Sequence, residues 1–365
     1  MPDAPVPASV SRRISVLRWP ACLVVVLVHM LQTFLFTDDF PASTGLLLHL
    51  GPSFHWAASC IYGTVVIGIV PLFFLFSGYL HFARPRPYPE ALRRRLPRLL
   101  VPMALWTAFF CALALAIAPF AGLSPRYDFL FSADPARWFT CLVGDYSAPF
   151  EPGICCPTVY QFWYLRDLVV LVLFGPLLRA ALRRCPLVFF VLACACAFGG
   201  WRPLIVGCNS LLFYSLGAFC GMRKIDFFDL VDRHCPWLPL LLAIAVQAVA
   251  IGRGDDPFLD AMPGCFFTVF AFLKASAALV ADERRHAFLH RMDRQSFFIY
   301  CAHGGSFAGA LFLLTAAVLP YERPGMVFLG IVVLFVLDAG FWTGIGLLLE
   351  RRAPRLFALL TGGRR

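Results

Sequence analysis

Ten apolar stretches, separated by short clusters of basic residues, restrict what this chain can fold into. A helix needs roughly 20 apolar residues to cross a bilayer, and most of the ten approach or exceed that length. The chain is 60% hydrophobic and 14% charged, whereas soluble domains average about 45–50% and 25%. The sequence therefore predicts an all-α, polytopic transmembrane helical bundle of about ten helices, at about residues 17–36, 58–82, 99–121, 162–182, 187–200, 204–221, 237–251, 258–281, 297–320 and 326–349.

The positive charges indicate which side of the membrane each loop occupies. With ten spans and a cytoplasmic N-terminus, most cationic residues fall in inner loops. We therefore expect one membrane-embedded domain over residues 1–365, with cytoplasmic tails at about 1–15 and 351–365 and a folded outer loop at about 122–161. The net charge of +10 follows from this loop bias, so no nucleic-acid partner is expected. The outer loops hold few arginines, namely Arg126, Arg137, Arg202, Arg253 and Arg323.

Most of the 14 cysteines lie in apolar stretches, where thiols behave as small hydrophobic groups. Cys141, Cys155 and Cys156 differ because they fall in the expected outer loop, where two of them could form a disulfide. The spacing typical of zinc sites is missing, so we predict no metal.

Arg18 and His29 share one face of the first predicted helix. They are eleven positions apart, which brings them to within about 20° of each other around the axis and about 16 Å apart along it. An ionisable group near the middle of a bilayer is costly and often functional. His29 could act as a general base near neutral pH, or it could hydrogen-bond between helices as a packing residue.

A polar interruption, Ser77-Gly78-Tyr79, marks the cytoplasmic end of the second predicted helix. It precedes an expected basic loop in which Arg95 and Arg98 lie one helical turn apart. Such a pair suits a phosphate group, although a topology signal would also explain it.

Aromatic and charged residues open the fourth predicted helix in the sequence QFWYLRDL. One face carries residues at the helical spacing i, i+3, i+4 and i+7, namely Tyr160, Trp163, Tyr164 and Asp167, with Arg166 adjacent. The aromatic residues could form an interfacial belt, while the Arg-Asp pair beside them could hold a sugar ring.

Further ionisable residues lie in the later apolar stretches. Tyr300 and His303 are one turn apart, and His303 is the second histidine predicted inside the membrane. Lys274 and Asp338 could pair with each other to offset desolvation.

In their order along the chain, six segments resemble the successive motifs of the acyltransferase-3 family of bacterial membrane O-acyltransferases. The resemblance covers about residues 12–350, and it depends on the combined order and spacing rather than on any one motif. The segments are RISVLRWPACLVVVLVH, VPLFFLFSGYL, RRRLPRLLVPMALW, FWYLRDL, FYSLGAFCG and SFFIYCAH.

The resemblance implies a multi-pass enzyme of the bacterial cytoplasmic (inner) membrane that moves an acyl group, commonly acetyl, from acyl-CoA to a hydroxyl of a cell-surface glycan or glycolipid. Acyl-CoA would be a co-substrate, with no bound cofactor. His29 would be catalytic, as general base or as transient acyl acceptor, with Arg18 assisting. Ser77, Tyr79, Arg95 and Arg98 would bind the donor, and Trp163, Arg166, Asp167, Tyr300 and His303 would form an acceptor or structural site.

One position departs from the family pattern. Members often carry Asp three residues before the motif arginine, and this chain has Ser15 there. How Arg18 is held is therefore left open, and a carboxylate from elsewhere in the chain could replace the missing one. Ten helices with scattered intramembrane charges would also suit a transporter or flippase of an envelope-glycan precursor, but matching inverted halves are not evident in the sequence.

Overall fold

The computed structural model describes most of the chain, and its regular elements are all helices. The predicted all-α class is therefore confirmed for this part of the chain. The described ranges are 6–35, 67–84, 86–121, 125–144, 157–199, 206–252, 257–303 and 324–363, together with isolated positions between 56 and 61 and between 311 and 319.

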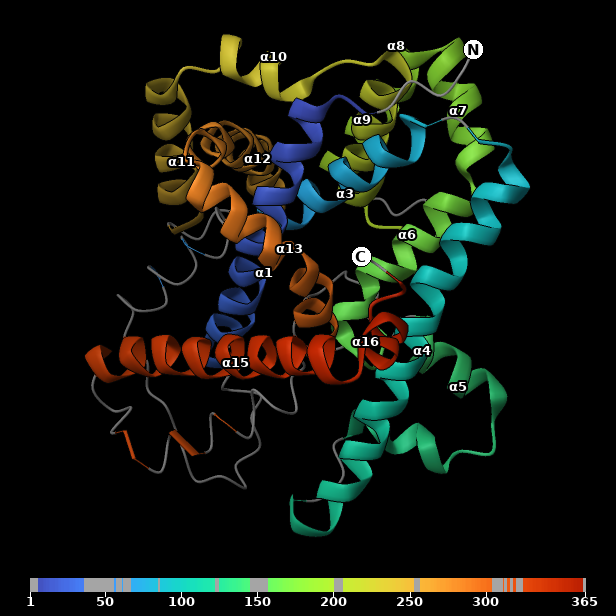
Figure 1. Ribbon diagram of the computed structural model, residues 1–365, viewed down its shortest axis with the longest axis vertical. Helices are drawn as coiled ribbons and strands as arrows, with labels where there is room; N and C mark the ends of the chain where they lie inside the picture. The colour runs from blue at the N-terminus through green and yellow to red at the C-terminus, as the bar shows by residue number, and fades with distance from the viewer. Residues whose placement is uncertain are drawn as a thin grey trace.

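The helices form one bundle around α1, and α15 runs across the lower end of α1 in this view (Figure 1). The N-terminal half holds α1 (Ala8–Leu35), α3 (Ile67–Phe82), α4 (Tyr88–Ala121), η4 (Pro125–Phe131), α5 (Pro135–Leu142), η5 (Tyr160–Phe162), α6 (Trp163–Leu173) and α7 (Gly175–Arg184). The remainder holds α8 (Pro186–Phe198), α9 (Cys208–Arg223), α10 (Phe227–His234), α11 (Trp237–Gly252), α12 (Pro257–Ala281), α13 (Glu283–Ala302), α15 (Pro324–Arg352) and α16 (Pro354–Leu360).

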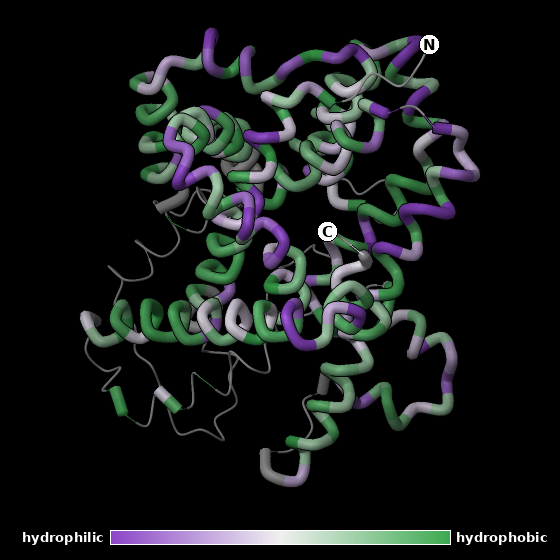
Figure 2. The backbone as a smooth tube through the Cα atoms, in the orientation of Figure 1, coloured by the Kyte–Doolittle hydropathy of each residue, from purple (hydrophilic) through white to green (hydrophobic). Residues whose placement is uncertain are grey.

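Several of these helices can cross a membrane by length and composition. Among the described residues three qualify alone, within α1, α4 and α15, and up to six qualify if each of three sharply bent helix pairs counts as one span. In Figure 2 α15 and the lower part of α4 are largely hydrophobic, whereas hydrophilic colour gathers on the first turns of α13. The chain is a multi-pass membrane protein; the count of ten spans and the side of each terminus stay predictions.

Several boundaries differ from those expected from apolar runs, including the start of α1, which lies at Ala8 rather than near residue 17. The expected helix at 162–182 is two helices, α6 and α7, which meet at Phe174 because Pro176 lies in the first turn of α7 and has no N–H to donate. The expected basic loop is instead the start of α4, so Arg95 and Arg98 are helical. Helix α13 begins at Glu283 rather than near 297, because the Asp282 side chain caps the N–H groups of Arg284 and Arg285.

Helices α3 and α9 approach so closely that glycine is required on both. A Cβ on Gly78 would lie 2.0 Å from the carbonyl oxygen of Tyr214, and one on Gly217 would lie 2.0 Å from that of Leu75. Gly217 and Gly221 form a G-x-x-x-G pattern, which lets helix backbones pack tightly in a membrane. This contact fixes α3, and with it Ser77.

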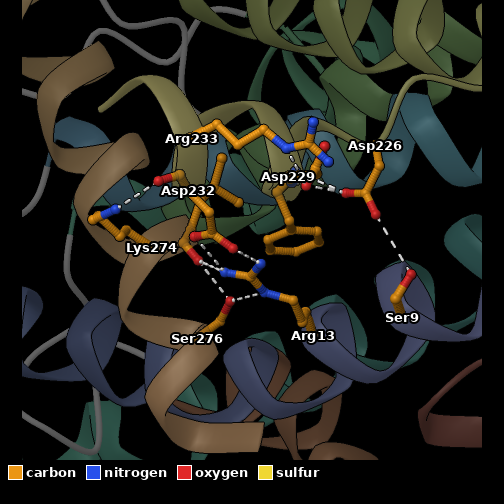
Figure 3. Close-up of polar contacts among 10 residues, drawn as sticks. Ser9, Arg13, Asp226, Asp229, Asp232, Arg233, Lys274 and Ser276 are labelled. Atoms are coloured by element: carbon orange, nitrogen blue, oxygen red, sulfur yellow. Dashed lines mark hydrogen bonds and ion pairs between the residues drawn. The ribbon is translucent and has the colours of Figure 1, made fainter. Parts of the chain in front are cut away.

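A buried polar cluster fixes the start of α1 (Figure 3). Arg13, only 8% exposed, donates two hydrogen bonds to the Asp232 carboxylate of α10. It also donates to Ser276 Oγ at 2.6 Å and to the Leu273 carbonyl at 2.7 Å, both on α12. The guanidinium lies 4.5 Å from the ring centroid of Phe228. The cluster thus holds α1 in a fixed rotation relative to α10 and α12.

The segment that we expect to form an outer loop contains η4 and α5 within its described residues. Asp134 caps α5 by accepting from Ala136 N, and the Trp138 indole packs edge-on against Phe129. Cys141 is buried there, and its carbonyl accepts from the backbone N–H and hydroxyl of Thr158. Cys155 and Cys156 lie outside the described residues, so the disulfide stays a prediction.

Candidate functional site

A cavity of about 560 Å³ opens between α1, α3, α4, α6, α7 and α13, and we call it the central cavity. It brings together residues that are far apart in the chain, such as Arg18 and Tyr300, which are separated by 282 positions. The sequence-predicted residues that line it are Arg18, His29, Ser77, Arg95, Arg98, Trp163 and Tyr300.

Arg18 is held by a carboxylate from another helix. Its Nη2 lies 3.2 Å from Oδ2 of Asp293 on α13, and Asp293 also lines the cavity. Ser15 does not contribute a charge, since its hydroxyl donates to the Arg12 carbonyl at 2.8 Å. Asp293 of α13 therefore supplies a carboxylate to Arg18, which the sequence had left open. Arg18 Nε is buried and has no hydrogen-bond partner among the described residues.

His29 is positioned by two rings. The Tyr160 ring contacts it edge-on, with centroids 4.8 Å apart, and the His303 ring stacks on it at 5.2 Å and 27°. Arg18 and His29 both line the cavity, in agreement with their eleven-residue spacing on α1. The imidazole is half-buried, so it can meet a substrate that enters the cavity.

His303 stacks on His29 but does not itself face the cavity. It is 2% exposed. Its Nδ1 lies 2.9 Å from the Ile299 carbonyl. Because a carbonyl only accepts, Nδ1 carries the proton in the neutral imidazole, and Nε2 then has a lone pair. Within the described chain Nε2 has no hydrogen-bond partner.

Three hydroxyl groups line or border the cavity beside His29. Ser77 Oγ and Tyr164 Oη lie 3.2 Å apart, and the Tyr164 and Tyr300 rings meet edge-on at 5.5 Å. Tyr300 donates to the Gln161 carbonyl. This ring and hydroxyl surface joins α3, η5, α6 and α13, and it offers both apolar faces and hydrogen-bonding groups to a substrate.

Arginines line one end of the cavity, which we call the arginine mouth. Arg95 is half-buried and donates to the Leu80 carbonyl at 3.0 Å. Arg98 lies one turn further along α4, and its carbonyl lies against Gly362 after α16, where a Cβ would come within 2.3 Å of it. The other members of the mouth are Arg84, Arg86, Arg94 and Arg179.

Besides His303, three predicted site residues lie outside the cavity lining. Tyr79 is 1% exposed and packs edge-on against Phe227 at 5.2 Å, which directs it into the core rather than toward a donor. Arg166 and Asp167 form a buried ion pair at 2.9 Å. Asp167 also accepts from Gly207 N at 2.9 Å, so this pair joins α6 to the start of α9 in the interior.

The expected pair between Lys274 and Asp338 is not formed. Lys274 Nζ instead donates to the Asp232 carbonyl at 3.1 Å and lies 5.9 Å from the Trp237 ring centroid. Asp338 is fully buried on α15. In the part of the chain that the structure describes, no cluster of His, Cys, Asp or Glu side chains could hold a metal ion.

Sequence reasoning missed Asp293 and Arg179 as members of the site. Asp293 lies in a basic cluster that we interpret as a topology signal. The signal that could have identified it is its position seven residues before Tyr300. Seven residues are nearly two helical turns, so the two share one face of α13. Arg179 carries no comparable signal, because only the break between α6 and α7 directs it toward the cavity.

Comparison with known proteins gives a consistent picture. The acyltransferase-domain family Acyl_transf_3 matches residues 12–342. The succinoglycan biosynthesis protein ExoH of Rhizobium meliloti (strain 1021) is 28% identical over 316 residues, which cover 81% of this chain and 79% of ExoH. No solved structure shows a significant match. The match spans all six motif segments and the elements that build the central cavity, and the chain therefore belongs to the acyltransferase-3 family of membrane O-acyltransferases.

Proposed function

We propose that the protein transfers an acyl group, acetyl in the first instance, from acyl-CoA to a hydroxyl group of an envelope polysaccharide or glycolipid in the bacterial inner membrane. The observation that carries the proposal is the central cavity, which connects the arginine mouth to His29. Guanidinium groups suit the phosphates of a CoA donor, and the charge pattern of the loops favours a cytoplasmic mouth. The relative ExoH is named for biosynthesis of the polysaccharide succinoglycan, which supports a glycan acceptor.

Two routes use the same histidine. In direct transfer, a nitrogen of His29 takes the acceptor's hydroxyl proton while that oxygen bonds to the thioester carbonyl carbon. The carbon–sulfur bond then breaks, and the thiolate takes the proton from the imidazolium. In the two-step route, the imidazole nitrogen attacks the thioester carbon, the carbon–sulfur bond breaks, and the CoA thiolate takes the ring proton. The acceptor hydroxyl then attacks the acyl carbon, the carbon–nitrogen bond breaks, and the hydroxyl proton returns to the imidazole. Arg18 N–H groups would stabilise the negative charge that develops on the carbonyl oxygen.

The donor proposal is tested with purified protein in lipid nanodiscs and a panel of radiolabelled short-chain acyl-CoAs. We expect the wild type to consume at least one donor slowly by hydrolysis, and faster when crude envelope glycan is added, with label appearing in the glycan. If the protein neither binds nor consumes any acyl-CoA with glycan present, the donor assignment is wrong.

The Arg18–Asp293 contact gives a separate prediction. Asp293→Asn removes the only carboxylate that contacts Arg18 among the described residues. We expect turnover to fall about tenfold, which corresponds to roughly 1.4 kcal/mol, because the guanidinium loses its fixed position. The initial rate of donor consumption is the measurement.

A second variant separates this effect from misfolding. Ser15 lies three residues before Arg18 on the same helix, so an Asp there can reach the guanidinium. The double variant Ser15→Asp/Asp293→Asn should recover most of the lost rate. Equal rates for wild type and Asp293→Asn, or no recovery in the double variant, would show that Asp293 does not position Arg18.

A further inference from the structure

The arginines around the central cavity divide by their ion pairs. Three have a carboxylate partner: Arg18 with Asp293 at 3.2 Å, Arg94 with Glu90 at 2.9 Å and Arg294 with Glu350 at 3.4 Å. The others that line the cavity have no ion pair among the described residues, namely Arg84, Arg86, Arg95, Arg98 and Arg179. This end of the cavity therefore has excess positive charge, which suits a ligand with more than one phosphate.

The guanidinium groups without an ion pair come from different helices that line the cavity. Arg95 and Arg98 lie one turn apart on α4, a spacing that suits the two adjacent phosphates of a diphosphate. Arg179 comes from α7, and the positive charges of Arg95 and Arg179 both act on His81, which is buried between α3 and α9. Figure 1 shows the start of α4 and α7 near each other at one end of the bundle. A second anionic group, away from the diphosphate, would meet Arg179.

Arg179 also contacts an aromatic ring, a contact that an arginine serving only to set the topology of a loop does not need. Its guanidinium lies 5.3 Å from the ring centroid of Phe82. Stacking on an aromatic face leaves the N–H edge free to bind an oxyanion with two hydrogen bonds. Arg183 and Arg184 on the same helix are exposed and lie outside the cavity lining. These two arginines can therefore supply the positive charge that sets the topology of this loop, and Arg179 is not needed for it.

We propose that Arg179 forms a subsite for the 3′-phosphate of the donor's ribose, while Arg95 and Arg98 bind the 5′-diphosphate. This inference rests on the proposed use of acyl-CoA. It means that the enzyme selects a nucleotide donor with a third, separate phosphate over a donor that ends in a diphosphate or a pantetheine phosphate. Arg84 and Arg86, exposed between α3 and α4, add positive potential at the same entrance.

The test is a comparison of CoA and 3′-dephospho-CoA, measured by calorimetric binding to the full-length protein in nanodiscs of zwitterionic lipid. We expect the wild type to bind CoA at least about tenfold more tightly, as a charge-assisted bidentate contact contributes that much. Arg179→Gln should abolish this preference by weakening CoA binding alone. Arg95→Gln should weaken both ligands and keep the preference. Arg184→Gln, on the exposed side of α7, should match the wild type.

Each outcome separates the subsite from the donor assignment. If CoA and 3′-dephospho-CoA bind equally to the wild type, or if Arg179→Gln weakens both ligands equally, the 3′-phosphate subsite is wrong while acyl-CoA stays the donor. Equal weakening of both ligands by Arg179→Gln would mean that Arg179 only adds positive potential to the cavity or binds a lipid headgroup phosphate. If neither ligand binds to the wild type, the donor assignment itself fails, and the subsite fails with it.

Discussion

Replacement of His29 by alanine is expected to lower acyl transfer by about 10³-fold, within the range of roughly 10²–10⁴ that a positioned general acid–base supplies. The imidazole lines the central cavity and is held between the rings of Tyr160 and His303. Alanine removes both the proton acceptor and the nitrogen nucleophile, so the loss is expected for either route. The measurement is the rate of label transfer from acyl-CoA under saturating donor.

Two controls make the His29 result specific. His290→Ala changes an exposed histidine on α13 that does not line the cavity, and it should keep the wild-type rate. Binding of CoA to His29→Ala should change little, because the arginines are intact, so the loss falls on turnover. A burst of labelled protein with donor alone, absent in His29→Ala, would identify the acyl-histidine route. Full activity in folded His29→Ala would place the chemistry elsewhere.

Alanine at Gly78 or Gly217 is expected to disrupt the fold. Each new methyl group would lie 2.0 Å from a carbonyl oxygen of the facing helix, and neither backbone can yield without separating α3 from α9. Overpacking of this kind costs roughly 1–3 kcal/mol and occasionally more, and here the obstacle is backbone. We expect a lower melting temperature and a lower yield of monodisperse protein, measured by fluorescence-detected gel filtration after heating.

Glycines with free space provide the matched control. Gly340 and Gly344 are also helical, on α15, and a Cβ on either would have no atom within 4 Å. Gly340→Ala and Gly344→Ala should therefore melt at the wild-type temperature or slightly above it, since alanine favours a helix over glycine. If Gly78→Ala and Gly340→Ala behave alike, the close contact of α3 and α9 does not limit stability.

The sequence pattern predicts helices well but locates their ends poorly. Apolar runs identify the membrane-embedded parts because burial in lipid depends on composition. They do not show that α4 starts at Tyr88, because its first turns are basic and arginine is a good helix former. They also merge α6 with α7, although Pro176 marks the break.

The site was only partly predictable for a related reason. Periodicity places Arg18 and His29 on one face of α1, and both line the cavity. It cannot show which face of the next helix meets them. Asp167 shares a helical face with Trp163 in the sequence, yet it is buried with Arg166 and Gly207. The pairing of Arg18 with Asp293 joins residues 275 positions apart, and no local spacing encodes it.

The origin of the carboxylate beside Arg18 affects how divergence in this family should be read. A column-by-column comparison of sequences would record Ser15 as the loss of a functional acid. In space the charge is still present, because Asp293 delivers it from α13. In this protein the negative group beside Arg18 thus comes from a helix 275 positions further along the chain, and a comparison of position 15 alone would not reveal it.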